Sequence, residues 1–560
     1  MAAQIPKKTT VLVIGGGPGG SYAASALARE GIDTVLLEGD KFPRYHIGES
    51  MLASIRHLLR FIELDEKFDR YGFIKKASQF LPCHLNPRKR EGYTDFLAAG
   101  GPNNYAWNVI RSEADKLMFD HAEESGAKCF DGVKVSEVQF EGGIKAVEKG
   151  AENLEPGKPI SATYQIKETG ETGEIAFDYV VDASGRIGLL STKYLKNRRY
   201  NQGLKNVANW SYWKGTKPYM PGTHKENSPF FEAMQDESGW VWLIPLHNGT
   251  TSVGVVENQK LSIEKKKASG AQSSQEFYLQ NLKLAPNLRA LIGDAEQVDK
   301  VHAASDYSYN ASSYAFSNAR IIGDAGCFID PYFSSGVHLA LVGGLSAAAT
   351  ICASIRGDVD EAVAADWHSK KIADAYTRFL LVVLSAYRQI RNQEEPVLTD
   401  IDEDDFDRAF AFFRPIIQGT ADVGNKKLDQ DVLNKTLEFC ANAFEPVKSE
   451  DDRAVAMEQI KADPNGTGFQ ADLSADQINA VNHIRARKMM RTEDTFNIDS
   501  FGSDAIAGYV PHLQRGMLSL KSVAKGGSNV PGQMMTMNGQ ANGMTGEMAA
   551  AQPTGVDVSA

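Results

Sequence analysis

The feature that most constrains this chain is a glycine-rich turn near its N-terminus. The apolar run 11–14 precedes Gly15-x-Gly17-x-x-Gly20, an Ala-rich helical stretch follows, and a second apolar strand ends at Glu38. In such a strand–turn–helix–strand unit the first glycine makes the tight turn and the second lets backbone amides approach a pyrophosphate. The third lets the helix pack closely on the strand. The pattern therefore predicts a dinucleotide-binding βαβ unit of the Rossmann type.

The helix start and the end of the second strand have the chemistry that a nucleotide requires. A helix N-terminus presents unpaired N–H groups and a positive dipole end to phosphates. Glu38 falls where a carboxylate accepts hydrogen bonds from ribose hydroxyls. A tight turn that binds no nucleotide is the alternative, and the register of Glu38 disfavours it. The sequence has no second glycine-rich βα turn, so it indicates no separate domain for NAD(P)H.

Three later segments decide between FAD and NAD. Residues 107–111 precede an amphipathic helix, residues 180–186 end a strand in a glycine turn, and a Gly-Asp pair at 323–324 follows a third strand. In this order and at these distances they resemble the flavin monooxygenase superfamily. The resemblance implies that Arg111 pairs with the FAD pyrophosphate and that Asp324 holds a ribityl hydroxyl. Taken alone, Arg111 could be a surface arginine, and Asp324 a turn residue or a helix cap.

The resemblance also implies a full set of FAD contacts. It places the flavin ring at the start of the helix that follows residues 334–336. The residues implied for the FAD site are Gly15, Gly17, Gly19, Gly20, Glu38, Arg44, Glu49, Arg111, Asp182, Gly323, Asp324 and Gly336.

A tryptophan-rich string narrows the chemistry. Residues 238–245 contain W-x-W-x-I-P, in which strand alternation puts Trp240 and Trp242 on one face and Pro245 ends the strand. Paired indoles on one face also suit ordinary core packing. As a string, however, it resembles the signature of the flavin-dependent halogenases. The resemblance implies a wall that denies the substrate direct access to the flavin, to which Phe333 also belongs.

A lysine pair follows the segment 44–50. Residues 72–77 resemble the halogenase segment that carries an essential lysine, and the register places it at Lys76, or at Lys75 if the register slips by one. A solvated surface pair is the alternative. The stretches RYHIGESML, REGYTDF, WNVIRSEADKLMF and DPYFSSGVHLAL resemble the fungal halogenases that chlorinate phenolic polyketides. This resemblance covers residues 8–350 firmly and 350–450 loosely.

The halogenase resemblance implies a mechanism. Reduced FAD, O2 and chloride or bromide yield hypohalous acid, which moves through a channel to Lys76. The lysine then either polarises the oxidant as an ammonium or, when neutral, captures it as a chloramine. Lysine suits both roles, because burial readily lowers its pKa and makes the neutral amine accessible. The backbone N–H groups of Ser335 and Gly336 are the candidate halide site. A separate NAD(P)H-dependent flavin reductase is the implied partner.

One departure from the halogenases of free tryptophan bears on the substrate. Those enzymes place a glutamate in a D-P-x-E-S-T-G stretch to receive the ring proton, and Phe333 occupies that position here. A phenol is more nucleophilic and releases its own proton, so the change favours a small phenolic substrate. Glu49, His302 and His338 are candidate bases, and each could equally be structural.

Three rival functions remain open from the sequence. A single-component aromatic hydroxylase that uses NAD(P)H shares the fold and the oxygen chemistry, but gives the same product without halide. A reductase of isoprenoid double bonds shares the glycine-rich and Gly-Asp regions and needs no oxygen. A flavin-binding protein without turnover is the third.

Composition argues against nucleic-acid binding, a metal site and a membrane span. The net charge is −11 with no basic stripe, which argues against nucleic acid. The five cysteines are scattered without metal-ligand spacing, so we expect no metal and a reducing, cytoplasmic location. The apolar run 337–355 is rich in Gly, Ala and Ser, so we expect a buried helix and no membrane span.

The predicted fold is α/β (α+β), with a glutathione-reductase-like FAD-binding Rossmann-type domain, an antiparallel substrate sheet and a helical C-terminal region. The expected segments are 1–200 for the first part of the FAD domain, with an insert at 70–110 that carries the lysine; 201–310 for the substrate-side sheet; 311–358 for the return to the FAD domain; 359–524 for the helices; and 525–560 for a disordered tail.

Overall fold

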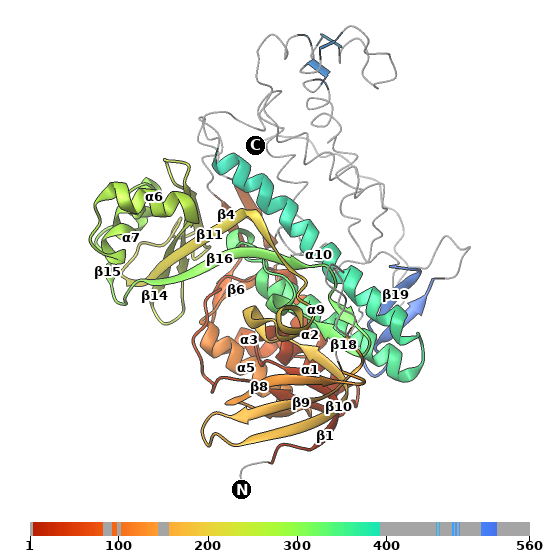
Figure 1. The fold of residues 1–560 in the computed structure, drawn as a ribbon. Helices are drawn as coiled ribbons and strands as arrows, with labels where there is room; N and C mark the ends of the chain where they lie inside the picture. The colour runs from red at the N-terminus through yellow and green to blue at the C-terminus, as the bar shows by residue number, and fades with distance from the viewer. Residues whose placement is uncertain are drawn as a thin grey trace, which may run out of the picture. The chain divides into compact units, whose positions relative to one another are not determined.

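A computed structural model of the chain describes residues 4–81, 92–97, 102–143, 156–223, 225–391 and 506–523, with a few isolated residues between 455 and 481. Within these residues the architecture is two large sheets with helices packed on them (Figure 1). The predicted tail at 525–560 and most of the predicted helical segment beyond residue 391 lie outside the described residues.

The first sheet has eight strands and contains the predicted βαβ unit. β1 (Lys8–Ile14), α1 (Pro18–Arg29) and β2 (Thr34–Leu37) follow in the expected order, with β1 and β2 parallel. The other strands are β7 (Lys128–Phe130), β8 (Val133–Phe140), β9 (Pro159–Ile166), β10 (Thr172–Asp182), β17 (Ala315–Phe316) and β18 (Ala319–Ile321). The spatial order is β17-β18-β10-β1-β2-β7, and β18, β10, β1, β2 and β7 run parallel. Their carboxyl ends therefore meet along one edge, where open α/β sheets bind ligands.

Two long apolar elements pack against each other at this edge. α9 (Gly336–Arg356) lies on α1, and a Cβ on Gly344 would approach the Gly19 carbonyl oxygen to 2.9 Å. α9 is long and apolar enough to cross a membrane, but 83% of its most apolar window is buried inside the protein. The expectation of a buried core helix is therefore confirmed.

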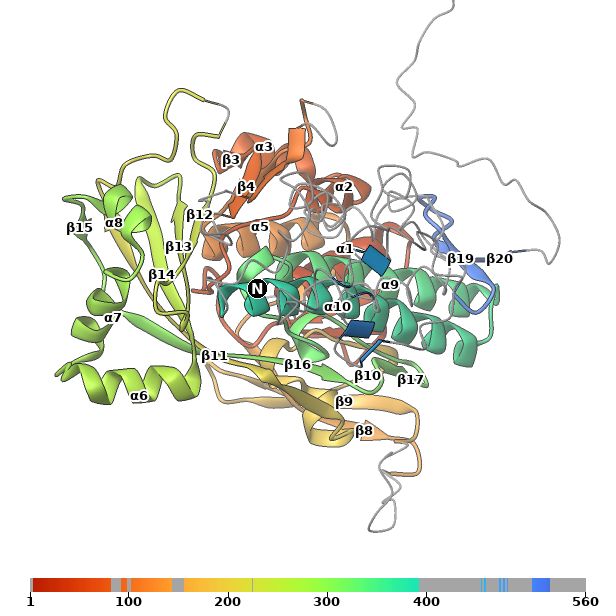
Figure 2. The same cartoon turned by 90° about the horizontal axis from the view of Figure 1, so that it is seen from above.

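The second sheet has six strands and is antiparallel throughout. It consists of β11 (Arg198–Lys214), β12 (Phe230–Ala233), β13 (Gly239–Pro245), β14 (Thr250–Asn258), β15 (Glu296–Gln297) and β16 (His302–Ala311). The helices α6 (Gln259–Ser269), α7 (Ser274–Leu282) and α8 (Pro286–Ile292) gather around it (Figure 2). Trp240 and Trp242 join the main core while Val241 and Leu243 join an outer cluster, so the predicted shared face of the tryptophans is confirmed.

Short elements lie between β2 and β7 of the first sheet in sequence. They are α2 (Ser54–Phe61), α3 (Asp65–Tyr71), β3 (Ile74–Lys76), β4 (Ser78–Leu81), β5 (Gly92–Asp95), β6 (Ala106–Asn108) and α5 (Arg111–Glu124). β3 pairs antiparallel with β6, while the backbone of Glu49 and Met51 hydrogen-bonds to Val109 and Trp107. The predicted lysine segment therefore lies beside residues 49–51.

The expectation of helix up to residue 524 is wrong at its end. After α10 (Glu361–Ile390), the next described elements are the paired strands β19 (Tyr509–His512) and β20 (Ser519–Ser522). A two-stranded ribbon tolerates Pro511 because each strand has a free edge. Arg356 donates to the Leu518 carbonyl, and Trp367 Nε1 donates to the Tyr509 carbonyl at 3.0 Å, so the ribbon is docked on α9 and α10.

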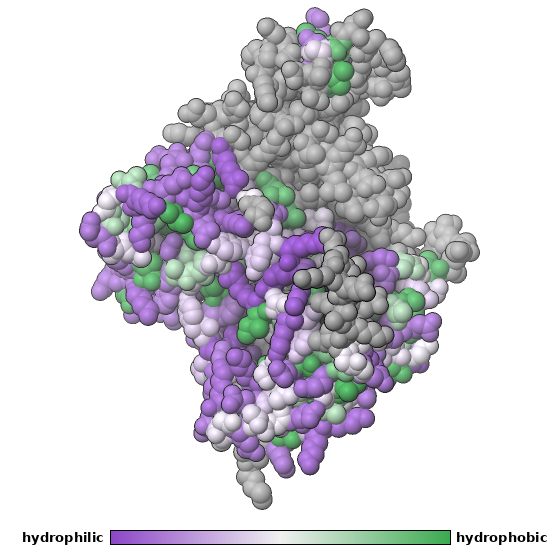
Figure 3. All heavy atoms as spheres, viewed as in Figure 1, coloured by the Kyte–Doolittle hydropathy of each residue, from purple (hydrophilic) through white to green (hydrophobic). Residues whose placement is uncertain are grey.

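The surface of the described residues separates cleanly from the apolar core. On the face in Figure 3, hydrophilic residues dominate and apolar ones are scattered between them. Scattered apolar residues are normal on a folded protein surface.

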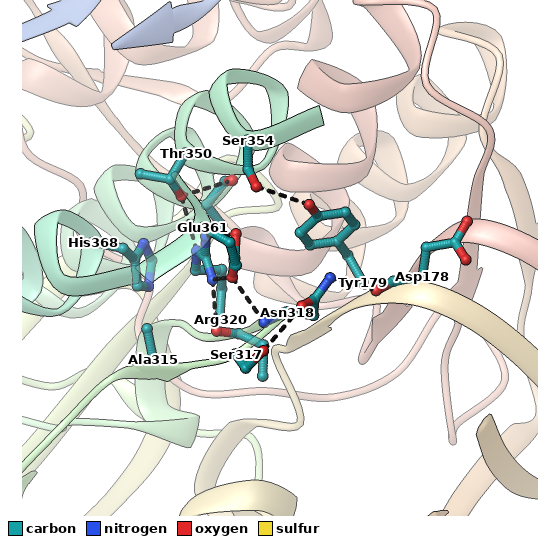
Figure 4. A network of polar contacts seen from close by, with 12 residues as sticks. Asp178, Tyr179, Ala315, Ser317, Asn318, Arg320, Thr350, Ser354, Glu361 and His368 are labelled. Atoms are coloured by element: carbon teal, nitrogen blue, oxygen red, sulfur yellow. Dashed lines mark hydrogen bonds and ion pairs between the residues drawn. The ribbon is translucent and has the colours of Figure 1, made fainter. Parts of the chain in front are cut away.

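A buried ion pair ties the first sheet to α9 and α10 (Figure 4). Arg320 on β18 is fully buried, and its Nη1 and Nη2 contact the Glu361 carboxylate at 2.8 and 3.0 Å. Its Nε donates to Thr350 Oγ1 at 3.0 Å, and the Asn318 amide donates to Glu361 at 2.7 Å. Nearby, the Tyr179 hydroxyl contacts Ser354 Oγ at 2.8 Å. These bonds hold the strand end that leads into Gly323.

We expect Arg320→Leu to lower the free energy of unfolding by about 3 kcal/mol, because it leaves the Glu361 carboxylate without its partner. Adding Glu361→Leu should recover part of the loss. Denaturant unfolding followed by tryptophan fluorescence measures both. Lys370→Ala, which removes the exposed pair with Asp366, is the matched control with an effect below about 1 kcal/mol. An Arg320→Leu protein as stable as this control would contradict the assignment.

Candidate active site

The glycine-rich turn and the start of α1 form an anion-binding corner. Gly15 has φ +105°, and a Cβ there would lie 2.2 Å from the Ala183 carbonyl oxygen. A Cβ on Gly20 would lie 1.8 Å from the Gly15 carbonyl oxygen, so both positions require glycine. Gly17 caps α1 without a side-chain hydrogen bond, and the Arg44 guanidinium lies 3.4 Å from where its Cβ would be. The uncapped helix end and Arg44 together suit a pyrophosphate.

Glu38 lies at the carboxyl end of β2, where its register predicted it. Its Oε2 accepts from the Gly16 amide at 2.6 Å, and its Oε1 accepts from the Asp40 amide at 2.8 Å. Arg44 Nε is 3.7 Å from Oε1. The carboxylate is thereby oriented at the edge of the sheet, where a ribose would meet it.

Arg111 is not a surface arginine. It is 5% exposed, its Nε and Nη2 bind the two Asp115 oxygens at 2.8 and 3.1 Å, and its Nη1 donates to the Ile47 carbonyl at 3.0 Å. Asp115 also accepts from Arg44 Nη1 at 3.0 Å. Sequence reasoning missed Asp115, although its i,i+4 spacing from Arg111 was the available signal. The contact of Arg111 with a pyrophosphate stays a prediction.

The Gly-Asp pair occupies a tight turn after β18. Gly323 has φ +55°, and a Cβ there would lie 3.2 Å from the Ala340 Cβ. Burial raises the pKa of Asp324, while Arg186, Arg111 and Arg198 lower it. The charge of Arg111 therefore reaches the buried Asp324 carboxyl.

Asp182 binds two backbone amides in this structure, and its implied contact with FAD stays a prediction. Its Oδ1 accepts from the Ser184 amide at 3.0 Å, and its Oδ2 accepts from the Leu190 amide at 2.6 Å. In this structure it holds the turn that packs on Gly15. The remaining donors and acceptors fit FAD: α1 amides and Arg44 for the pyrophosphate, Glu38 for the ribose and Asp324 for the ribityl chain.

Lys76 is fully buried. Its Nζ donates to Ser50 Oγ at 2.9 Å and to the Met51 carbonyl at 2.8 Å, and it lies 5.2 Å from the centre of the Phe96 ring. Burial lowers the pKa of Lys76 well below its usual value. Lys75 is exposed instead, with its Nζ over the Tyr105 ring. Of these two lysines, Lys76 is therefore the buried amine, and Ser50 is a partner that sequence reasoning did not find.

The two tryptophans belong to a continuous aromatic layer. Trp240 and Trp242 are 1% and 5% exposed, and their ring centres are 5.9 Å apart. Tyr332 meets Trp240 edge to face at 5.0 Å and Phe333 at 5.0 Å. Phe333 thus joins the layer through Tyr332, while Pro245 ends β13.

Comparison with known proteins identifies the family. The family model described as tryptophan halogenase matches residues 10–81 and 84–432. The flavin-dependent halogenase ascD of Acremonium egyptiacum is 71% identical over 521 residues, which cover 93% of this chain and 93% of that protein. The chain belongs to the flavin-dependent halogenases.

Two further relatives agree with this. The sulochrin halogenase gedL of Aspergillus terreus is 52% identical over 522 residues, covering 92% of this chain and 94% of that protein. The solved structure of the myxobacterial chondrochloren halogenase CndH has a TM-score of 0.60 at 24% identity, covers 92% of this chain and 100% of that chain, and shares the fold. The predicted fold and family are therefore confirmed.

Membership in this family defines the cofactors. A flavin-dependent halogenase uses FAD as FADH2 together with halide and O2. The hydroxylase, the isoprenoid reductase and the non-enzymatic flavoprotein are therefore set aside. Halogenases of this family generally receive reduced flavin from a separate reductase and act on small molecules.

In this halogenase a buried hydrogen-bond cluster holds the aromatic layer. Trp240 Nε1 donates to the Tyr387 hydroxyl at 2.7 Å, which donates to Asp330 Oδ2 at 2.6 Å. Asn206 Nδ2 donates to the same Asp330 oxygen at 2.9 Å, and the Tyr332 amide donates to Oδ1 at 3.1 Å. Sequence reasoning missed Tyr387 and Asn206, because α10 and β11 meet this loop only in the folded chain.

The predicted halide residues begin α9. Ser334 has φ +57°, and Ser335 is the N-cap residue of α9. The Ser335 hydroxyl makes no capping hydrogen bond; it is buried and has no hydrogen-bond partner among the described residues. This combination suits an anion, although the halide site itself stays a prediction. His338, one candidate base, points into the core, where its Nδ1 lies 2.9 Å from Ser54 Oγ.

The other two candidate bases are His302 and Glu49. His302 contacts Asp299 Oδ2 at 2.8 Å. Glu49 is 4% exposed, its Oε1 accepts from the Tyr212 hydroxyl at 2.7 Å, and burial raises its pKa to about 7. The Glu49 carboxyl therefore changes its charge near neutral pH.

We expect Arg44→Ala to weaken FAD binding about tenfold or more, because a charge-assisted contact with the pyrophosphate is lost. Quenching of FAD fluorescence on titration with the apoprotein measures the dissociation constant. Lys41→Ala, at an exposed neighbouring cation, should bind FAD like the unmodified protein. Equal affinities for both variants would remove Arg44 from the site.

We expect Tyr387→Phe to uncouple FADH2 oxidation from halogenation. The variant removes the hydroxyl that accepts from the Trp240 indole, so the wall of aromatic residues is held less firmly. The yield of halogenated product per FADH2 oxidised should fall several-fold, while the rate of FADH2 oxidation stays the same. Tyr278→Phe is the matched control, because Tyr278 likewise accepts from an indole, that of Trp213, at 3.0 Å, but in the outer cluster. A similar yield from both variants would contradict a role for Tyr387 in the wall.

Proposed function

We propose that this enzyme chlorinates or brominates an electron-rich phenolic ring of a polyketide-type small molecule, through hypohalous acid that is delivered to Lys76. The observation that carries the proposal is the fully buried amine of Lys76, held by Ser50 Oγ at 2.9 Å and the Met51 carbonyl at 2.8 Å. A solvated lysine pair would not have these contacts.

Bound FAD in its reduced form supplies the two electrons that convert O2 and halide into hypohalous acid and water. The chain supplies the anion site for the halide. The backbone amides of Ser335 and Gly336 lie at the start of a 21-residue helix, and Ser335 Oγ is buried without a partner among the described residues. A hydroxyl and helix-end amides can donate to one halide.

Lys76 receives the oxidant on the other side of the aromatic layer. Its burial in an apolar environment favours the neutral amine. A neutral amine captures electrophilic halogen as a chloramine, whereas an ammonium would polarise hypohalous acid through a hydrogen bond. Trp240, Trp242, Pro245 and Phe333 form the wall in this proposal and prevent the ring from approaching the flavin directly.

The proposal of a phenolic substrate rests on Phe333, the wall residue that stands where the halogenases of free tryptophan have a glutamate. Phe333 is 3% exposed and cannot accept a proton where those enzymes have a glutamate. A phenol releases its own proton as the ring is halogenated, so no carboxylate is needed there. A relative named for sulochrin, at 52% identity, also supports a substrate other than tryptophan.

The partners follow from the same chemistry. We propose that an NAD(P)H-dependent flavin reductase in the cytoplasm supplies FADH2. Nucleic acid and membranes are not part of the proposed function, since the chain has a net charge of −11 and its most apolar helix is a core helix.

We expect Lys76→Ala to consume O2 and FADH2 normally but to lose halogenated product roughly hundredfold or more. The purified protein is supplied with FAD, a flavin reductase, NADH and bromide, with a panel of phenolic polyketides, and products are identified by the bromine isotope pattern in mass spectra. Lys76→Arg separates the two roles, because arginine keeps the charge but cannot supply a neutral amine.

Lys75→Ala is the matched control and should give normal product, because Lys75 is exposed. Normal product from Lys76→Ala would overturn the lysine assignment. Hydroxylated product that forms equally well without halide would overturn the proposed reaction.

A further inference from the structure

A chain of hydrogen bonds runs from the surface to the buried carboxyl of Glu49. Tyr45 is 54% exposed, and its hydroxyl lies 3.0 Å from the hydroxyl of Tyr212 on β11. Tyr212 in turn donates to Glu49 Oε1 at 2.7 Å. Trp210 Nε1, also on β11, contacts the Tyr45 hydroxyl at 2.7 Å. Glu49 Oε2 is buried and has no hydrogen-bond partner among the described residues.

The chemistry of the two ends determines the direction of every bond. The Trp210 indole can only donate, so the Tyr45 oxygen accepts from it. An ionised Glu49 carboxylate can only accept, so Tyr212 donates to it. Tyr45 must therefore donate its own hydrogen to Tyr212. Every hydrogen in the chain points from the exposed tyrosine towards the buried carboxyl.

The chain of hydrogen bonds ends beside a cavity of about 190 Å³. Glu49, Tyr45 and Tyr212 line it together with Arg111 and Ser112 from α5. The cavity is large enough for several water molecules. Because Arg111 and Glu49 also belong to the set of residues implied for the FAD site, the cavity adjoins the proposed flavin position.

The reaction of this family consumes a proton at that position. FADH2, O2, one halide ion and one proton give FAD, hypohalous acid and one water. Two electrons from the flavin and two from the halide reduce O2 to the oxygen atoms of hypohalous acid and water, and the proton balances the charge of the halide. Halogenation of the ring by hypohalous acid then releases water and takes up no further proton. One proton per turnover must therefore enter a site that the aromatic layer closes on its substrate side.

We propose that Tyr45, Tyr212 and Glu49 form a proton conduit that brings this proton from solvent to the flavin side of the active site. The proposal rests on the proposed function, because it requires that hypohalous acid be made from FADH2, O2 and halide. It gives Glu49 a role as the last proton donor of the conduit, distinct from the base on the substrate ring that the sequence left open.

The charges around Glu49 support the proposal. Burial raises the pKa of Glu49 to about 7, opposed by the hydrogen bond of Tyr212, by the nearby Ser252 hydroxyl and by the charges of Arg111 and His302. Below that pH the carboxyl is protonated and can donate. Above it, the carboxylate must be protonated again through Tyr212. Glu49 can therefore release and regain a proton near neutral pH.

The neighbouring groups do not offer a competing donor. The Arg111 charge, with desolvation, lowers the pKa of His46 to about 4, so His46 is neutral near pH 7. Burial raises the pKa of both Tyr45 and Tyr212, so the tyrosines pass protons as neutral hydroxyls. His302 stacks on the Tyr45 ring at 5.3 Å, but its Nε2 is turned to Asp299 at the surface.

The first test follows Glu49 in the apoprotein, without flavin. Infrared difference spectra between about pH 5.5 and pH 8.5 should show a protonated carboxyl C=O band that titrates near pH 7 and is absent in Glu49→Gln. In Tyr212→Phe the midpoint should rise, because the ionised carboxylate loses its donor. Tyr179→Phe, which removes a tyrosine hydroxyl bonded to Ser354, is the matched control and should leave the band unchanged.

The second test follows proton delivery in the enzyme with FADH2, O2 and bromide. Tyr45→Phe and Tyr212→Phe should form hypobromous acid about tenfold more slowly at pH 8 than the unmodified enzyme. Imidazole buffer, whose imidazolium form is a small weak acid that diffuses into the cavity and donates the proton, should restore the rate of Tyr45→Phe as its concentration rises. A purely structural loss would not be rescued. Thermal melting verifies folding, and Tyr45→Phe carries the test alone if Tyr212→Phe does not fold.

The outcomes are separable. Unmodified enzyme that makes no halogenated product would overturn the proposed function. Normal halogenation by the unmodified enzyme, together with equal rates in Tyr45→Phe, Tyr212→Phe and Tyr179→Phe, would overturn the conduit alone. A slow Tyr45→Phe enzyme that imidazole does not rescue, or a Glu49 band that does not titrate, would also overturn it.

Discussion

The backbone of residues 47–51 is the constraint on which the rest of the active site depends. Arg111 binds the Ile47 carbonyl from one side, while the Glu49 carbonyl and the Met51 amide pair with the strand at 107–109. Arg111 is itself fixed by the buried carboxylate of Asp115. Because successive side chains of an extended segment point in opposite directions, Glu49 faces the cavity and Ser50 faces Lys76. One short segment therefore positions both halves of the chemistry.

This arrangement supports the proposal that the oxidant is made and used in separate places. The proposed proton conduit and the proposed FAD contacts lie on one side of residues 49–50, and the buried amine of Lys76 lies on the other. The aromatic layer of Trp240, Tyr332 and Phe333 is held by the Tyr387–Asp330 hydrogen bond at 2.6 Å. Since Asp330 also opens the loop to the proposed halide site, the wall and that site are braced by the same carboxylate.

The parts predicted correctly were those with a local signal. The order of β1, α1 and β2, the position of Glu38 and the shared face of Trp240 and Trp242 all follow from residue spacing, which is the same in the chain and in the fold. The β19–β20 ribbon was missed because each strand is only four residues long and β19 contains Pro511. An alternating pattern of four residues is too short to be told apart from a helical one. Asp182 matched a cofactor motif, and the structure adds that its oxygens bind two backbone amides, which the motif did not indicate.

By itself the sequence determined the βαβ unit and the family, because turn chemistry, strand alternation and motif register are properties of neighbouring residues. Only the tertiary structure decided which groups meet. Lys76 meets Ser50, which is 26 residues away, whereas the pairs Glu49–Tyr212 and Trp240–Tyr387 are 163 and 147 residues apart in the chain. It also decided their protonation, because the pKa of Glu49 and of Lys76 depends on removal from water. Burial is produced by packing of distant segments, which no local pattern specifies.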